Sequence, residues 1–243
     1  VAQLSSKETS VSEVMKSTIA KIWEVNDQVN AIVSFREEKD LLSEADAADQ
    51  VPMDKRGVLH GLPIAIKDLV DAKGLPTSQG SPIFADHIAQ HDALTVARIR
   101  TAGAIIIGKT NTPEFGLGSH TFNPVFGTTR NPYDLNRSAG GSSGGAAVAL
   151  ATGMISIADG SDMMGSLRNP AAWNNVYGMR PSWGLVPSEP KEDVFIHSLS
   201  TNGPMARNPK DLGLLLSVMS GADHRLPFSM SNENLLPVHA SDL

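Results

Sequence analysis

The sequence predicts an α/β fold, and three features carry that prediction. Short apolar runs at residues 62–66 and 104–107 are typical of buried strands. Residues 92–102 between them favour a helix, so strand, helix and strand alternate along the chain, as they do in α/β proteins. Apolar residues also recur at helical spacing near both ends of the chain, which predicts amphipathic helices there.

Two helices are expected in the N-terminal segment, residues 1–56. Ser10 and Glu13 have the spacing of a capping box, which begins a helix. The apolar residues after it recur at helical spacing: Val14, Ile19, Ile22, Val25 and Val29. A second helix is expected over residues 36–50, and Pro52 ends it.

The strand at residues 62–66 is followed directly by Lys67 and Asp68. Because adjacent side chains of a strand point to opposite faces, Asp68 is expected to face away from Lys67. The next helix is expected to have Asp92 as its N-cap and Gly103 as its stop. The apolar strand therefore places Lys67 where a lysine is readily desolvated.

The rest of the chain alternates irregular stretches with short elements. Residues 111–145 are rich in Gly, Asn, Pro, Ser and Thr, and loops of this length in compact domains are usually functional. A helix is expected at residues 146–152, a strand at 154–158 and irregular structure at 160–175. The final helix is expected at residues 208–221, from an Asn cap to a Gly stop.

Composition and charge exclude several classes of protein. The 243 residues, 41% of them hydrophobic, suffice for one sizeable core. A net charge of −6 and a pI of about 5.6 argue against a nucleic-acid partner. The absence of cysteine excludes disulfides, zinc–thiolate sites and a cysteine nucleophile, and it fits a reducing compartment, so we expect a cytoplasmic protein. No apolar run approaches the length of a membrane span, and the chain begins at Val1 rather than Met, which leaves its natural N-terminus open.

Residues 103–110 match G-x-x-x-x-G-K-[ST], the phosphate-binding P-loop pattern. A P-loop needs a flexible loop that opens into a helix. Here the middle residues are Ala-Ile-Ile-Ile, which favour a strand, and Pro113 disfavours helical geometry at Thr112. A core strand followed by a turn is therefore the favoured interpretation, and a nucleotide-binding protein is the alternative from another functional class.

Residues 140–144 match G-x-S-x-G, the nucleophile elbow of α/β-hydrolases, with Ser142 at its centre. That elbow follows a buried strand, whereas the residues before it here are polar and turn-like. Its triad would need a downstream acid and a histidine, for which Asp162 with His197 or His224 could be proposed. We rank this interpretation below one in which the glycines around two adjacent serines permit close backbone approach and unusual dihedral angles.

Ser166 lies 24 residues beyond Ser142 and follows an apolar strand, a position where sites form in α/β folds. From about residue 10 to about residue 225 the chain resembles the amidase-signature hydrolases. Five segments carry the resemblance, in the order typical of that family: residues 61–68, 108–116, 131–145, 162–170 and 178–187.

The resemblance implies one domain over residues 1–243, with helices on both faces of a mixed sheet in a three-layer α/β/α sandwich. Residues 57–225 would hold the catalytic core motifs, and residues 226–243 would be a loop cut off within the fold. Family members are considerably longer than this chain. We therefore expect that only the N-terminal half to two-thirds of the domain is present.

The resemblance also implies roles for individual residues. Ser166 would be the nucleophile, Ser142 the bridging serine after a cis Gly141–Ser142 peptide, and Lys67 the base. Backbone N–H groups would line the oxyanion hole: Met163, Met164, Gly165 and Ser166. The supporting groups would be Gly141, Ser143, Asp162 and Arg168. Met164 departs from the family, which usually has Gly there, and it would be strained if that position required a positive φ.

Such a site would hydrolyse a carboxylic amide to the acid plus ammonia or an amine. A lysine is a base only when it is neutral, so burial must lower the pKa of Lys67 from its usual value of about 10.4. Ser142 would relay the proton from Ser166 to Lys67 and return it to the leaving amine. No metal or cofactor is required.

Two alternatives remain beside the amidase interpretation and the P-loop protein. A glutaminase-type subunit of a tRNA-dependent amidotransferase ranks lower because no tRNA-binding patch is visible, and an inactive scaffold is suggested by Met164 and the missing part of the domain. The expected partner is a small-molecule amide substrate, with no nucleic acid and no membrane. A homodimer and the remainder of its own chain are left open as protein partners.

Overall fold

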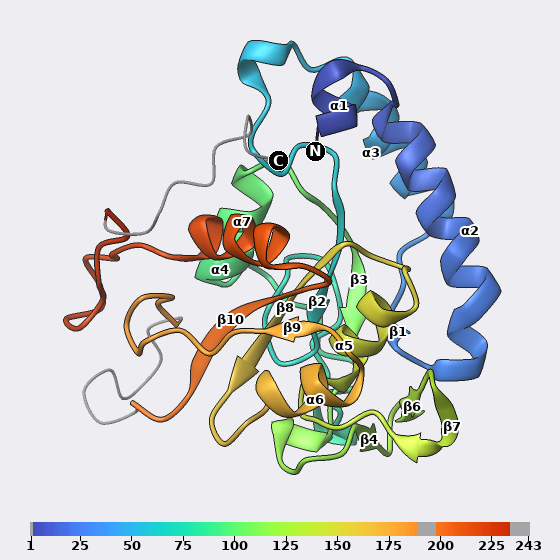
Figure 1. Ribbon diagram of the computed structural model, residues 1–243, viewed down its shortest axis with the longest axis vertical. Helices are drawn as coiled ribbons and strands as arrows, with labels where there is room; N and C mark the ends of the chain where they lie inside the picture. The colour runs from blue at the N-terminus through green and yellow to red at the C-terminus, as the bar shows by residue number, and fades with distance from the viewer. Residues whose placement is uncertain (1, 189–197, 234–243) are drawn as a thin grey trace.

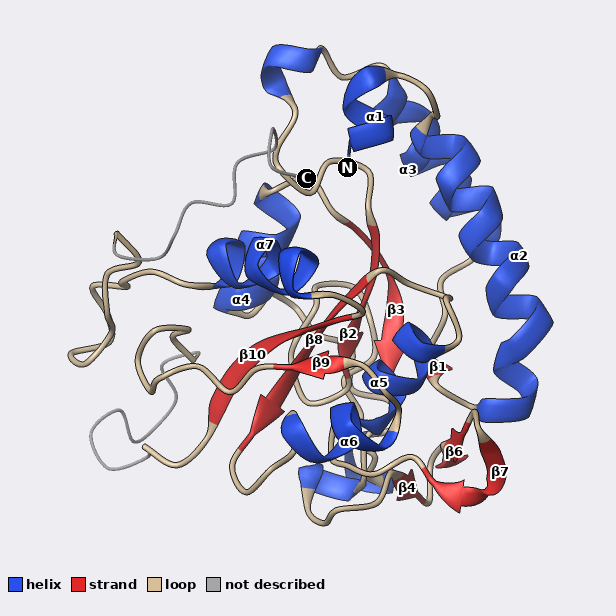
Figure 2. Cartoon of the chain, in the orientation of Figure 1, coloured by secondary structure: helices blue, strands red, loops and turns tan. Residues whose placement is uncertain are grey.

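The computed structural model describes residues 2–188 and 198–233. Its main strands form two three-stranded sheet sections, meaning two groups of strands that are each joined by backbone hydrogen bonds (Figures 1 and 2). In the first section, β3 pairs in parallel with β2 and antiparallel with β1. In the second, β10 pairs antiparallel with both β8 and β9. The strands of the two sections are β1 (Ile32–Val33), β3 (Ile105–Thr110), β2 (Pro63–Lys67), β8 (Ile157–Asp162), β10 (Thr201–Ala206) and β9 (Tyr177–Gly178).

Strands β2 and β8 lie side by side where the two sections meet (Figure 2). Side chains of β2 and β3 alternate between two apolar clusters, so each strand has two buried faces. Ala65, Ile105 and Ile107 belong to one cluster, whereas Ile64 and Ile106 belong to the other. Side chains that alternate between opposite faces are the expected pattern of a strand. The strands therefore lie between two layers of helices.

Helices cover both faces of the strands (Figure 1). The first cluster contains apolar residues of α2, α3 and α5, and the second contains those of α4 and α7. The α/β sandwich around a mixed sheet is therefore confirmed. The helices are α1 (Ala2–Ser6), α2 (Val11–Val29), α3 (Glu38–Asp49), α4 (Leu94–Thr101), α5 (Gly144–Ala151), α6 (Arg168–Trp173) and α7 (Pro209–Met219).

The segment between β3 and α5 contains only short elements, as its composition predicts. Two hairpin-like pairs, β4 with β5 and β6 with β7, hold it together. The short elements of the chain are η1 (Met53–Lys55), η2 (Pro82–Phe84), η3 (Glu114–Gly116), β4 (Phe122–Asn123), β5 (Gly127–Thr128), β6 (Arg130–Asn131) and β7 (Asp134–Ser138).

The predicted N-caps of two helices are confirmed, and the predicted N-cap of a third helix is wrong. Ser10 Oγ accepts the Glu13 N–H at 3.0 Å, and the Glu13 carboxylate accepts the Ser10 N–H at 2.8 Å, which is the capping box. Asn208 caps α7. Helix α4 instead begins after Ala93, because the Asp92 carboxylate accepts hydrogen bonds from Arg100 and from the Lys73 N–H.

Two strand boundaries differ from expectation. Strand β3 continues through Thr110, so residues 108–110 pair with β2 and cannot form a P-loop. Strand β8 begins later than expected and includes residues 160–162, which the sequence predicted to be irregular, because β10 pairs with it over its whole length. No helix within residues 2–188 and 198–233 is long and apolar enough to cross a membrane.

Candidate active site

Lys67 is the last residue of β2, and its side chain is fully buried. Its Nζ lies 2.7 Å from Ser142 Oγ, 2.9 Å from Ser143 Oγ and 3.0 Å from Ser161 Oγ. The strand therefore delivers the lysine to a cluster of three hydroxyl groups. Two of them come from the Gly/Ser segment before α5, and the third comes from β8.

Burial lowers the pKa of Lys67 from its ordinary value of 10.5 to about 7, although the charges of Asp159 and Asp162 oppose that change. Asp68 makes its contacts elsewhere. Its carboxylate accepts hydrogen bonds from Ser78 Oγ and from the Gly80 N–H, and it lies 3.9 Å from Lys109 Nζ. Asp68 thus faces away from the hydroxyl cluster, as predicted, and a neutral amine is accessible near neutral pH.

The segment that carries the serine pair is fixed by close backbone packing. The Gly141–Ser142 peptide is cis, as expected. The Gly145 N–H donates to the Asn111 carbonyl oxygen at 3.2 Å, and a Cβ on Gly145 would lie 2.3 Å from the Asn111 nitrogen. Only glycine allows this approach, so the sequence of the segment sets the distance between the serines and β3.

Replacing Gly145 by alanine is expected to destabilise the fold by about 3 kcal/mol or more. The added methyl group would clash with backbone atoms, which no change of side-chain rotamer can move away. Gly153→Ala is the matched control. Its φ of +77° carries a conformational cost of about 1 kcal/mol, but among the described residues no heavy atom beyond its two chain neighbours lies within 4 Å of the added carbon. Urea unfolding of both variants measures the difference, and equal losses would contradict the packing argument.

Ser166 lies in the loop between β8 and α6 and is partly exposed. Its carbonyl oxygen accepts the Ser143 N–H at 3.2 Å, so its backbone lies against the serine pair. Its hydroxyl makes no hydrogen bond with any residue that the structure describes. The structure therefore joins Lys67 to Ser142 and brings Ser166 beside them without closing the contact between the two hydroxyls.

The backbone N–H groups of the expected oxyanion hole divide into two kinds. The Gly165 N–H donates to Asp162 Oδ1 at 2.7 Å. It is therefore not free to bind an oxyanion in this structure, contrary to the expectation. The N–H groups of Met163, Met164 and Ser166 have no acceptor among residues 2–188 and 198–233. The positive φ of this loop falls on Gly165, at +114°, and not on Met164, so the strain considered for Met164 does not arise.

Asp162 organises this loop from a fully buried position. Burial favours its neutral form, but hydrogen bonds from Arg168, from backbone N–H groups and from Arg180 hold the pKa of Asp162 well below its usual range. Arg168 binds the carboxylate through two nitrogens, at 2.9 and 3.0 Å. Arg180 also donates to the Met163 carbonyl oxygen at 3.0 Å, which ties the loop to the segment after β9.

Three residues that contact Lys67 or Asp162 were not predicted from the sequence: Arg180, Ser161 and Asp159. Arg180 lies in a recognised motif, but nothing in its spacing shows that it reaches Asp162 at 3.0 Å. Ser161 was assigned to an irregular stretch. Its place in β8, two residues from Asp159, would have predicted that both side chains face the same neighbour.

The α/β-hydrolase interpretation is not supported by this geometry. The strand before Ser142 is β7, which is largely exposed rather than buried. The carboxylate of Asp162 is bound by arginines, and no histidine within the described part of the chain contacts it. No hydrogen bond joins His224 to Ser142 among the described residues, and His197 lies outside them.

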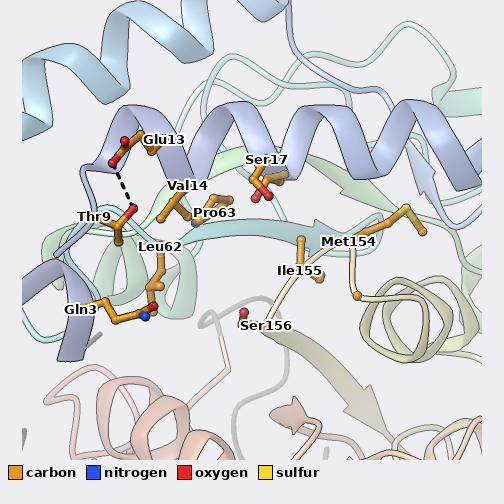
Figure 3. Close-up of a pocket in the computed structure, with 12 residues that line it drawn as sticks. Gln3, Thr9, Glu13, Val14, Ser17, Leu62, Pro63, Met154, Ile155 and Ser156 are labelled. Carbon is orange, nitrogen blue, oxygen red and sulfur yellow. Dashed lines mark hydrogen bonds between the residues drawn. The ribbon is translucent and has the colours of Figure 1, made fainter.

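A cavity of about 310 Å³ lies at the opposite end of β2, beside Pro63, and is lined by residues such as Glu13 and Ser156 (Figure 3). It does not include Lys67 or either proposed catalytic serine. The described residues contain no cluster of three or more His, Asp or Glu side chains that could hold a metal ion. Lys67 and the three hydroxyl groups that it contacts thus lie at the other end of β2 from this cavity.

Comparison with known proteins points to one family. A family model described as Amidase matches residues 13–236. A glutamyl-tRNA(Gln) amidotransferase subunit from Saccharolobus solfataricus is 42% identical over 225 residues, which cover 93% of this chain and 46% of that protein. The acylamidase of Rhodococcus erythropolis is 40% identical over 241 residues, which cover 99% of this chain and 50% of that protein.

Solved structures agree with the sequence comparison. A bacterial aryl acylamidase of the amidase-signature family has a TM-score of 0.88 and 34% identity, and the match covers 95% of this chain and 49% of that one. The native peptide amidase of Stenotrophomonas maltophilia has a TM-score of 0.87 and 32% identity, with coverage of 97% and 50%. This chain spans about half the length of the relatives that it matches.

Proposed function

Because the chain belongs to the amidase family, we propose that it hydrolyses a carboxylic amide to the acid plus ammonia or an amine. The observation that carries the proposal is the buried amine of Lys67, with a pKa near 7, at 2.7 Å from Ser142 Oγ. A serine hydroxyl is a weak nucleophile until a base takes its proton, and a neutral lysine is such a base.

In the proposed reaction, Ser166 Oγ attacks the amide carbonyl carbon while its proton passes to Ser142 and the Ser142 proton passes to Lys67. The C–N bond then breaks, and the same path returns the proton to the leaving nitrogen. An acyl ester on Ser166 remains. Water, activated by the same relay, adds to the ester and releases the acid. A rotation of the Ser166 side chain on substrate binding would close the relay, because catalytic contacts often tighten only in the complex.

The negative charge on the carbonyl oxygen requires fixed donors. The N–H groups of Met163, Met164 and Ser166 are the candidates, because no described residue accepts from them. Asp162 takes the Gly165 N–H at 2.7 Å and is in turn held by Arg168, so its role would be to shape the loop that presents the other donors. Fixed backbone donors of this kind typically contribute about 3–4 kcal/mol each to lowering the barrier.

Labelling with a fluorophosphonate tests the nucleophile directly. The probe phosphonylates an activated serine, and intact mass should show one adduct, which peptide mapping should place on Ser166. Ser166→Ala should remove the adduct, whereas Ser156→Ala, at the far end of β2, should leave it unchanged. An adduct on Ser142 instead would support the α/β-hydrolase interpretation and overturn the proposed roles.

A glutaminase-type subunit of an amidotransferase is the second candidate, and the relative from Saccharolobus solfataricus favours it. Hydrolysis of glutamine compared with simple aliphatic and aryl amides would separate the two functions. Partners other than a small amide stay predictions, including a second copy and further parts of its own chain. A cytoplasmic location also stays a proposal. The P-loop interpretation is withdrawn, because Lys109 lies fully buried within β3 and donates to the Val70 carbonyl oxygen.

A further inference from the structure

Asp159 occupies the junction between β2 and β8. It lies within β8 and is almost fully buried, and its Oδ1 accepts the Lys67 N–H at 2.8 Å. Strand β2 pairs through its backbone with β3, and β8 pairs with β10. Among the described strands no backbone ladder joins β2 to β8, so the Asp159 carboxylate supplies the hydrogen bond that a neighbouring strand would otherwise give to Lys67.

The same face of β8 contacts Lys67 twice. Asp159 accepts its backbone N–H, and Ser161, two residues further along the strand, lies 3.0 Å from its Nζ. Alternate residues of a strand point to the same side. Asp159 and Ser161 therefore bind both the backbone N–H and the side-chain amine of Lys67. A change at Asp159 would therefore alter the place from which the Lys67 side chain reaches Ser142.

Asp159 also has an electrostatic role, because it is surrounded by buried charges. Burial raises the pKa of Asp159, while the backbone hydrogen bond from Lys67 and the charges of Lys109 and Lys67 oppose that rise. The other buried acids in the neighbourhood are Asp68, on the far side of Lys109, and Asp162, at the end of β8. An anion at position 159 favours the protonated form of Lys67 and so limits the effect of desolvation.

We propose that Asp159 is a positioning residue for amide hydrolysis, one that joins β2 to β8 at Lys67 and places an ionisable carboxyl group near the Lys67 amine. This inference rests on the proposed function, in which Lys67 is the base. It predicts separate consequences for the hydrogen bond and for the charge. The hydrogen bond sets the geometry of the relay, and the charge sets the pH at which Lys67 becomes neutral.

Two substitutions separate these consequences. Asp159→Asn keeps an acceptor oxygen and removes the charge, whereas Asp159→Leu removes both with a larger, branched apolar side chain. Asp68→Asn is the matched control, since it neutralises a buried acid that faces Lys109 rather than Lys67. The pH dependence of kcat/KM is measured for each variant, and fluorophosphonate labelling counts the folded, competent sites.

Asp159→Asn is expected to move the acid limb of the profile to lower pH by about one unit, because Lys67 then loses its proton more readily. Asp159→Leu is expected to lower kcat by about 10- to 100-fold, because the base is misplaced. Asp68→Asn should leave the acid limb at its wild-type position. An Asp159→Asn profile that coincides with the wild type would overturn the proposal, as would an Asp159→Leu enzyme with undiminished kcat. Should Asp159→Leu not fold, the Asp159→Asn profile decides alone.

The proposed function is tested separately by Ser166→Ala and Lys67→Ala in the same assay. Wild-type enzyme that hydrolyses no amide would overturn the function itself, and activity that survives both changes would overturn the roles of Ser166 and Lys67. Activity that requires both residues, with a wild-type acid limb in Asp159→Asn, would overturn only the role of Asp159. The two failures are therefore distinguishable.

Discussion

Replacing Ser166 by alanine is expected to lower kcat for amide hydrolysis by at least about 10⁴-fold, because the acyl-enzyme can no longer form. Binding and the oxyanion donors remain, so some acceleration over water should persist. The fold should be little changed, since the Ser166 hydroxyl is partly exposed and makes no hydrogen bond within the described residues. A progress curve at high enzyme concentration, with release of free amine as the signal, measures the loss.

Ser142→Ala, alone and combined with Ser166→Ala, tests whether the two serines act in one proton relay. Ser142→Ala breaks the path between Ser166 and the Lys67 amine, which lies 2.7 Å from Ser142. Residues that act as one unit give strongly non-additive losses, so the Ser142→Ala, Ser166→Ala double variant should be no slower than the worse single variant. Fully additive losses, or wild-type kcat in Ser166→Ala, would show that the two hydroxyls do not act in one relay.

The sequence predicted the parts of this site whose positions depend on local pattern. The apolar run that ends at Lys67 became a buried strand, and the glycine-flanked serines became a tight segment against β3. Both follow from rules that act within a few residues: strand formation by branched apolar side chains, and close approach by glycine. The capping box before α2 belongs to the same class.

The parts that the sequence did not predict depend on partners far along the chain. Residues 160–162 are rich in Gly, Ser and Asp, and only pairing with β10, some forty residues later, makes them a strand. Asp92 has a capping residue type, yet Arg100 and the Lys73 N–H take its carboxylate. The Asp159 contact with Lys67 joins strands that share no backbone ladder, so no local pattern could reveal it.

Substituting Lys67 by methionine is expected to abolish hydrolysis and to change how stability varies with pH. The folded protein lowers the pKa of this group from 10.5 to about 7, so between these values the unfolded chain binds more protons than the folded one. Wild-type stability must therefore rise with pH across this window relative to Lys67→Met, which lacks the titrating group. Above pH 10.5 the cost of burying the amine disappears, and below pH 7 it is present in full.

The size of the effect follows from the displacement of the pKa. The full difference between the two limits is about 5 kcal/mol, and about 2 kcal/mol of it should develop between pH 7 and pH 9. Urea unfolding of wild type and Lys67→Met at both pH values measures it, with Lys16→Met as the control for removal of an exposed lysine from α2. A wild-type advantage that does not grow with pH would mean that the buried amine stays charged. The same result would remove the base from the mechanism, because a protonated lysine cannot accept the proton that Ser142 must pass on when Ser166 attacks.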